Sequence, residues 1–512
     1  MRAFESPERA GVPRLHDATA YASALHLWQT GEYSACLEML ASHDDGLSLA
    51  LRGLALLRLG HPAEVIALLH DHRTDDLSER VAVLNVLARA FARTRDEGSA
   101  QAIVDELTML APHAGSMSAD IARCAALVAW MRGDTDRAER SLEAAFGDAT
   151  PLGRAKYYEL CSWIAARREN YSEQARLLTL AAKQLLDDPL SDVGLFADVT
   201  RTLATLNREL SLPEIAPHVE RLITSIPWTS DLSVQHFNAV RDLGWHHALH
   251  GRFLPALRLL HEAERIAPSR PWCIMALLDR ARLASWAGEP ASSTASLYHA
   301  LDLEPQVAWD RTDDEERSAL LVAADVCAEV DALRAHALLE RFQQVAGGFG
   351  PLMIARGDRR LLAHRLSVAG AVQHAMGSDR AAGDSYRAAY VIFGEVGYRW
   401  RAAICASRLF ALTAERSWLA LGAEHVRDYP HSWIARELAT AGADVDDAVR
   451  RLTPREREVL QGLLSGLRIT HIAGRLQISP HTAKHHATAI YRAFHVDSQS
   501  GLMAEAKRRG LV

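Results

Sequence analysis

The stretch VRDLGWHHALHGRFLPALRLLHEAERIAP, residues 240–268, predicts two consecutive amphipathic helices. Its apolar residues recur at three- and four-residue spacing, and Gly251 interrupts the pattern between the two helices. Gly244 and Ala256 are small enough to let the helices cross closely, and Pro268 ends the second helix. The stretch therefore predicts one pair of packed helices joined by a short turn.

Residues 16–440 continue this pattern, with short breaks and without the alternating periodicity of strands. The same spacing of small residues and prolines recurs at Gly288, Pro290, Ala300 and Pro305. Weaker repeats of the pattern begin at Gly31, Gly60, Gly133 and Gly377. These spacings resemble the tetratricopeptide repeat (TPR). The resemblance implies an all-α solenoid of about nine to eleven helix pairs.

A TPR-like array implies a concave groove for a protein, a peptide or a small molecule. We therefore expect the body to bind an effector of one of these kinds. The alternative is a scaffold that mediates self-association only.

Composition suits a folded protein, with 49% hydrophobic and 24% charged residues. No apolar run reaches the roughly 18 to 20 residues that span a bilayer, and the first residues lack the apolar core of a signal peptide. We expect a cytoplasmic protein without a membrane segment. The six cysteines are scattered singly, which indicates buried thiols in a reducing compartment rather than disulfides or a metal site.

His246 and His250 have the i,i+4 spacing of a helical metal site. A third ligand and a general-base carboxylate at the spacing of a zinc protease motif are missing, which favours packing over metal binding. The chain also lacks a nucleophile arrangement typical of an enzyme, so we expect neither catalysis nor a cofactor.

The C-terminal segment, residues 452–512, predicts four short helices. Thr453 caps the first, which ends at Gly466, and Thr470 opens the second. Ser479 caps the third, with proline at its first position. The fourth covers about 500–509 and ends at Gly510.

This segment resembles the LuxR-type DNA-binding domain in its pattern L-T-x-R-E-R-E-V-L, then I-A-x-x-L-x-I-S-x-x-T-x-K-x-H, then I-Y and a final G-L-V. The resemblance implies a bacterial transcription regulator whose third helix enters the major groove of double-stranded DNA, as a homodimer on a two-fold operator.

Two faces can be distinguished on the third helix. Ala483, Ala487, Ile490 and Phe494 form an apolar stripe that we expect in the core. A polar stripe offers cations and hydrogen-bonding groups to DNA. With flanking residues, the expected DNA contacts are Ser479, His481, Thr482, Lys484, His485, His486, Thr488, Arg492, Arg468 and Thr470. The alternative is a metal site at His481 and His485, but no cysteine or nearby carboxylate completes a ligand set.

The segment departs from the family where cations are usual, at Ala493 and Gln499. Fewer phosphate contacts lower affinity and its salt dependence. Arg468, Arg475 and Arg492 are candidates to compensate.

Charge is divided unevenly along the chain. Residues 451–512 hold ten Arg and Lys against four Asp and Glu, whereas the whole chain has a net charge of -7. A basic C-terminal segment after an acidic body indicates that this segment, rather than the body, binds a polyanion. We therefore expect an N-terminal tail (1–15), a TPR-like domain (16–440), a linker (441–451) and a DNA-binding domain (452–512). The alternative function is a TPR adaptor whose degenerate helix-turn-helix binds protein.

Overall fold

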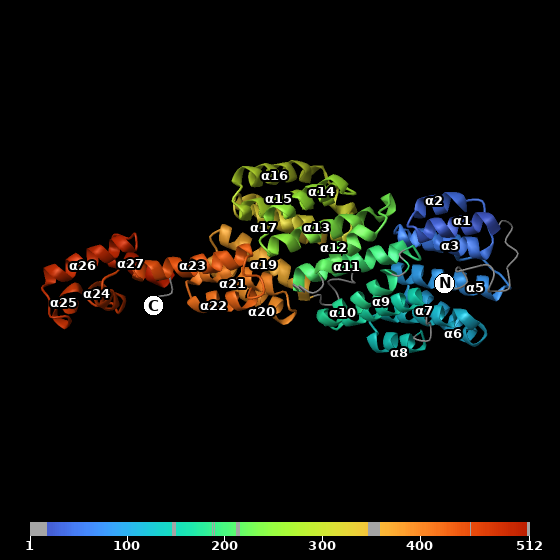
Figure 1. Ribbon diagram of the computed structural model, residues 1–512, viewed down its shortest axis with the longest axis horizontal. Coiled ribbons are helices and arrows are strands. Elements are labelled where there is room, and N and C mark those ends of the chain that lie inside the picture. Colours follow the sequence, from blue (N-terminus) through green and yellow to red (C-terminus); the bar gives the residue numbers. More distant parts are fainter. Residues whose placement is uncertain are drawn as a thin grey trace. The chain divides into compact units, whose positions relative to one another are not determined.

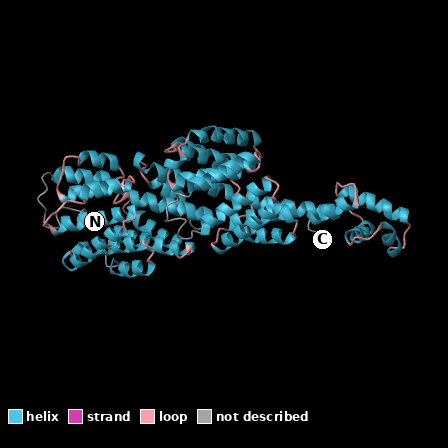
Figure 2. Ribbon diagram, turned by 180° about the vertical axis from the view of Figure 1, so that it is seen from behind, coloured by secondary structure: helices cyan, strands magenta, loops and turns pink. Residues whose placement is uncertain are grey.

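The computed structural model describes residues 18–145, 150–186, 188, 190–210, 216–346, 359–450 and 452–508. Within these ranges the regular structure is helical and contains no strand (Figure 2), which confirms the expected all-α class. No helix in this part of the chain combines the length and apolarity needed to cross a bilayer. The expected tail, 1–15, and Gly510 lie outside the described residues.

The chain divides into two compact units, residues 1–243 with 262–269, and residues 244–261 with 270–512. In chain order (Figure 1), the helices of the first unit are α1 (Ala18–Gln29), α2 (Tyr33–Met39), α3 (Gly46–Arg58), α4 (Pro62–Leu69), α5 (Leu77–Thr94), α6 (Glu97–Leu110), η2 (Ala111–His113), η3 (Gly115–Met117), α7 (Ser118–Met131), α8 (Thr135–Ala145), α9 (Pro151–Arg167), α10 (Tyr171–Leu186), α11 (Val193–Leu210), α12 (Ala216–Ser225) and η4 (Ser230–Leu232).

The helices α13 (Ser233–Leu249) and α14 (Phe253–Ile266) contribute to both units. The second unit continues with α15 (Arg270–Ala287), α16 (Pro290–Leu303), η5 (Glu304–Gln306), η6 (Trp309–Arg311), α17 (Asp314–Cys327), α18 (Ala332–Ala346), α19 (Arg359–Ala375), α20 (Asp379–Glu395), α21 (Arg399–Thr413), α22 (Arg416–His425), α23 (Trp433–Arg450), α24 (Pro454–Leu464), α25 (Ile469–Arg475), α26 (Pro480–Ala493) and α27 (Gln499–Arg508).

Consecutive helices pack in pairs, as a TPR-like array requires. In the first unit α3 packs on α4, α5 on α6, α7 on α8 and α9 on α10, while α3, α5, α7 and α9 also pack on one another in order. In the second unit α15 packs on α16, α17 on α18, α19 on α20 and α21 on α22. In the first unit, the first helices of these pairs therefore form one continuous layer.

Glycines in the left-handed conformation end the first helix of several pairs. This conformation suits glycine because it has no Cβ to clash with the backbone. The positive-φ glycines at these turns are those that the sequence pattern singles out: Gly31, Gly60, Gly133, Gly251, Gly288 and Gly377. In other pairs the same turn is made by Arg95 (φ 66°) and Glu169 (φ 57°).

The stretch that predicted the fold forms α13 and α14 around Gly251, whose φ is 74°. A Cβ on Gly244 would lie 3.3 Å from the carbonyl oxygen of Ala256, and Ala256 is fully buried. The small residues therefore permit the close crossing that the sequence predicts.

The core of the second unit holds an aromatic cluster. Trp245 lies 5.6 Å from Trp400 between ring centroids, and Trp286 stacks on Trp433 at 4.5 Å. His246 is buried on the same helix as Trp245, and its ring lies 4.5 Å from that of His250. Burial, with His250, His247 and Arg252 nearby, lowers the pKa of His246 to about 3. His246 is thus a neutral, packed histidine, and the described residues hold no group of three or more His, Cys, Asp or Glu side chains arranged to bind a metal.

The cysteines are free thiols, but not all are buried as expected. Cys161 and Cys273 are half-buried, and the other four are buried.

Residues 441–450, assigned to a linker from their composition, continue α23 as helix. The segment contains no proline, the residue that interrupts a helix most strongly, and a linker can be helical.

Candidate nucleic-acid interface

The helix α26 begins where the sequence predicts. The backbone N–H of Thr482 donates to the Ser479 hydroxyl at 3.0 Å, and Pro480 occupies the first helical position. This bond satisfies an N–H that the helix itself leaves without a partner. The Thr482 hydroxyl lies 2.7 Å from that of Ser479, so both side chains are fixed at the N-terminus.

One face of α26 is core. Ala483, Ala487, Ile490 and Phe494 are each at most 1% exposed. Ala487, Ile490 and Phe494 pack in a cluster with apolar residues of α24, α25 and α27, including Leu463, Ile472 and Leu502. The apolar stripe predicted from the sequence is therefore confirmed, and it fixes which face α26 turns away from its own core.

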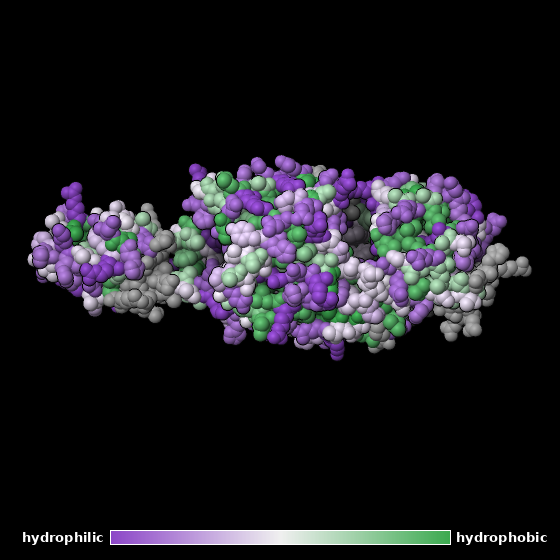
Figure 3. Space-filling model, turned by 90° about the horizontal axis from the view of Figure 1, so that it is seen from above, coloured by the Kyte–Doolittle hydropathy of each residue, from purple (hydrophilic) through white to green (hydrophobic). Residues whose placement is uncertain are grey.

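The opposite face is exposed. It carries His481, Lys484, His485, Thr488 and Arg492, all exposed, while His486 is half-buried between the two faces. Ser479, Thr482, Arg468 and Thr470 are exposed as well. Hydrophilic residues cover most of the visible face of this module in Figure 3. The structure thus brings the predicted DNA contacts of α26 together on one accessible surface.

The preceding helix differs slightly from prediction. The helix α25 starts at Ile469 with Arg468 at its N-cap, and no side chain caps it. Thr470 therefore lies inside the first turn instead of opening the helix, because Arg468 already has the extended backbone of a cap. Both residues remain exposed at the start of α25.

The turn between α25 and α26 is tied to α24. Gln477 adopts a φ of 53°, and the Arg455 guanidinium donates to the carbonyl of Leu476 just before it. Arg455 also pairs with Glu458 at 2.5 Å. In the sequence, Arg455 stands out only as part of the pattern that resembles the family. The bond by which Arg455 holds the turn is visible only in the three-dimensional structure.

Gln499, where relatives usually have a cation, has a structural role. Its side-chain amide donates to the carbonyls of Leu463 at 3.1 Å and Leu467 at 3.2 Å, in the turn after α24. Gln499 therefore connects the start of α27 to the end of α24 and the turn that follows it.

The capping box at α24 places a carboxylate near the histidines. The Thr453 backbone N–H donates to the Glu456 carboxylate at 2.7 Å. This bond is the main reason that the pKa of Glu456 is lowered, and His486 and His485 contribute further. An acidic group thus borders the histidine side of α26 and limits where a phosphate can approach.

Comparison with protein families identifies residues 450–506 as matching "Bacterial regulatory proteins, luxR family". Comparison with curated proteins finds no match.

Solved structures similar to the chain include a Rap protein in complex with competence and sporulation factor (12% identity, 68% of this chain and 99% of that one, TM-score 0.38). Others are a monomeric IFIT1 mutant with Gppp-AAAA (13% identity, 81% and 94%, TM-score 0.40) and a signal transduction ATPase with a tetratricopeptide repeat sensor from Pyrococcus horikoshii (11% identity, 75% and 66%, TM-score 0.34).

The capped α26, its buried stripe and its exposed polar face coincide with the residues that match the family. Residues 450–506 are therefore a LuxR-family helix-turn-helix domain, and a TPR-like helical array precedes that domain in the chain.

Proposed function

We propose that this protein regulates transcription in the bacterial cytoplasm by binding specific DNA sequences through α26, under the control of an effector bound by the helical array. The observation that carries the proposal is the division of α26 into a buried stripe and an exposed face with Lys484, Arg492 and two exposed histidines. A helix so divided can enter the major groove without disturbing its own core.

The exposed side chains suit different parts of DNA. Lys484 and Arg492 supply charge for phosphates, and Thr488 and the histidines supply hydrogen bonds for base edges. Ser479, Thr482, Arg468 and Thr470 lie beside the N-termini of α26 and α25, where exposed groups reach the sugar–phosphate backbone. His486 flanks the groove-facing side.

We further propose that two copies bind together on an operator with two-fold symmetry, as helix-turn-helix dimers do. A footprint of the full-length protein on genomic DNA tests this point directly. Two half-sites about one helical turn apart are expected, and a single asymmetric half-site would contradict the dimer.

DNA affinity of the full-length chain tests the main proposal. We expect Lys484→Ala combined with His485→Ala to weaken binding by about 10-fold or more and to reduce the salt dependence. Arg265→Ala is the matched control, because Arg265 is exposed on α14 and pairs only locally with Glu262. If neither wild type nor variant shows salt-sensitive binding, the regulator proposal fails and the adaptor alternative remains.

A further inference from the structure

The first unit contains a cavity of about 300 Å³ that the DNA-binding function does not use. Its walls come mainly from the first helices of successive pairs: α3, α5, α7, α9 and α11. It therefore lies on the layer that a TPR-like array commonly offers to ligands. The volume is at the lower end of small-molecule sites, which span roughly 300 to 1,000 Å³.

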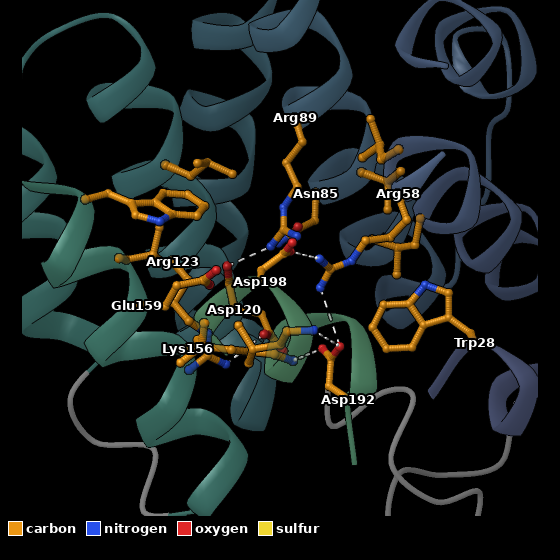
Figure 4. Close-up of a pocket in the computed structure, with 18 of the residues that line it drawn as sticks. Trp28, Arg58, Asn85, Arg89, Asp120, Arg123, Lys156, Glu159, Asp192 and Asp198 are labelled. Atoms are coloured by element: carbon orange, nitrogen blue, oxygen red, sulfur yellow. Dashed lines mark hydrogen bonds and ion pairs between the residues drawn. The ribbon is translucent and has the colours of Figure 1, made fainter. Parts of the chain in front are cut away.

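Helical spacing brings the polar residues of the cavity to one side of each helix. Asn85 and Arg89 are four residues apart on α5, and Asp198 and Thr202 are four apart on α11. Figure 4 shows the side chains of Arg58 and Arg89 directed toward the region of Asp198. Groups distant in the sequence thus face one enclosed volume.

Cations outnumber carboxylates in this lining. The cations are Arg58, Arg89, Arg93, Arg123, Lys156 and Arg201. The carboxylates are Asp120, Glu159, Asp192 and Asp198. The lining therefore carries an excess of positive charge, which favours an anion.

Several of these groups are paired with one another. Arg58 bonds to Asp198 at 2.5 Å and approaches Asp192 at 3.4 Å, and Arg123 bonds to Asp120 at 2.7 Å. Lys156 lies 3.9 Å from Asp192. Three of the four carboxylates are thus already engaged by Arg58, Arg123 and Lys156.

The fourth carboxylate adds little negative charge at neutral pH. Burial, reinforced by Asp198, raises the pKa of Glu159 to about 8. In the same lining, the Nε of Arg89 is buried without a hydrogen-bond partner among the described residues. A buried donor of this kind is costly unless a ligand or water accepts its bond.

The rest of the lining is apolar. Trp28 and Leu54 contribute from α1 and α3, Leu160 and Trp163 from α9, and Val199 from α11. These residues offer an apolar surface next to the cationic groups. The cavity consequently offers both cationic groups for an anion and apolar surface for hydrocarbon.

We propose that this cavity binds a small amphipathic acid, with the acid's carboxylate held by Arg89 and its apolar chain packed against Leu54 and Leu160. The carboxylate accepts charge-assisted bonds from the guanidinium, including the buried Nε. That this acid is the effector rests on the function proposed above. That the acid binds in the cavity is independent of that function.

The same chemistry has two sources, a free organic acid and the C-terminal carboxylate of a short peptide. Octanoate represents the first source and N-acetyl-Leu-Leu the second. Their neutral counterparts, octanamide and N-acetyl-Leu-Leu-amide, keep the apolar part and remove the charge. Isothermal titration of the full-length protein with all four probes compares the sources and isolates the carboxylate.

We expect at least one acid to bind and its amide to bind about 10-fold more weakly or worse. Arg89→Gln should weaken the acid by a similar factor, whereas Arg89→Lys should restore part of it. Arg80→Gln is the matched control on the same helix, because Arg80 is exposed and pairs with Glu106. Its effect should stay within about 2-fold.

Equal binding of acids and amides, or no binding of either acid at millimolar concentration, would overturn the proposal. An unchanged affinity in a folded Arg89→Gln protein would do the same. If that variant does not fold, the acid–amide contrast on wild type still decides. DNA affinity is measured separately. If the acids do not bind but DNA does, only the proposal of a ligand in this cavity fails. If an acid binds but DNA does not, only the proposal of a DNA-binding regulator fails.

Discussion

Gly462 on α24 lies so close to Ile472 on α25 that a Cβ at position 462 would sit 2.8 Å from the Ile472 Cγ1. Ile472 is 1% exposed and belongs to the core of the DNA-binding domain. The contact fixes the crossing of the two helices that precede α26. A side chain at 462 must therefore displace Ile472 or separate α24 from α25.

We predict that Gly462→Ala destabilises the DNA-binding domain by about 1 to 3 kcal/mol through overpacking. Gly474→Ala is the control, because Gly474 lies in α25 and a Cβ there would have no atom within 4 Å. This variant should increase the stability of the domain slightly, because alanine has a higher helix propensity than glycine. Calorimetric unfolding of both variants measures the difference. Equal stability of the two would show that the crossing tolerates a methyl group.

Ser479 allows stability and DNA binding to be separated. Ser479→Ala removes the cap bond to Thr482 and should cost about 1 kcal/mol of domain stability. Ser479→Asp keeps a capping oxygen but adds a negative charge at the α26 N-terminus, which faces DNA under the proposed function, so stability should return while DNA affinity falls. Thermal unfolding and DNA titration of the two variants provide the readouts. Full DNA affinity of Ser479→Asp would place this end of α26 away from phosphate.

Arg95 holds a left-handed backbone at the end of α5, with a φ of 66°. A non-glycine residue in this conformation costs about 1 to 2 kcal/mol, so Arg95→Gly should stabilise the first unit by up to about 1 kcal/mol after the added flexibility of the unfolded chain is subtracted. Arg80→Gly, within α5, should destabilise by about 1 kcal/mol. Opposite shifts of the unfolding temperature are the expected outcome, and a loss of stability in Arg95→Gly would contradict it.

His246 makes stability depend on pH. Its pKa of about 3 in the folded protein lies below the ordinary value of about 6.5, so the unfolded chain takes up the proton more readily. The stabilising contribution is present above about pH 6.5 and is lost progressively as pH falls toward 3. We predict that His246→Gln makes the unfolding temperature less sensitive to acid between pH 6.5 and 4.5.

His336→Gln is the matched control for this experiment, because His336 is about half exposed in the same unit. It should leave the acid sensitivity unchanged. A His246→Gln protein that loses stability with acid as steeply as wild type would mean that other groups govern the response.

The helical pairs could be predicted where glycine marks the turn, as at Gly251 and Gly288, because few other residues adopt that backbone readily. The turns at Arg95 and Glu169 have the same conformation and are closed by local backbone bonds, but no glycine marks them in the sequence. The helical continuation of α23 through residues 441–450 was not predicted, because their composition suggested a linker and carried no clear helical pattern.

In the DNA-binding domain, the cap at Ser479 and the stripe from Ala483 to Phe494 are local features, and both were predicted. The role of Gln499 was not, since its bonds reach a turn more than 30 residues away. The cavity of the first unit was invisible for the same reason, because its charged residues come one or two at a time from five helices.

The glycine turns have a consequence for how such an array can change length. Gly60 and Gly133 both have a φ of 87°, so the chain leaves one helix and enters the next with the same local torsion at both places. A duplication or deletion whose ends fall at two such turns joins one glycine turn to another with the same φ. The backbone at the junction can therefore keep its φ. Whole helix pairs could therefore be added to or removed from the array at these glycines without a new φ at either junction.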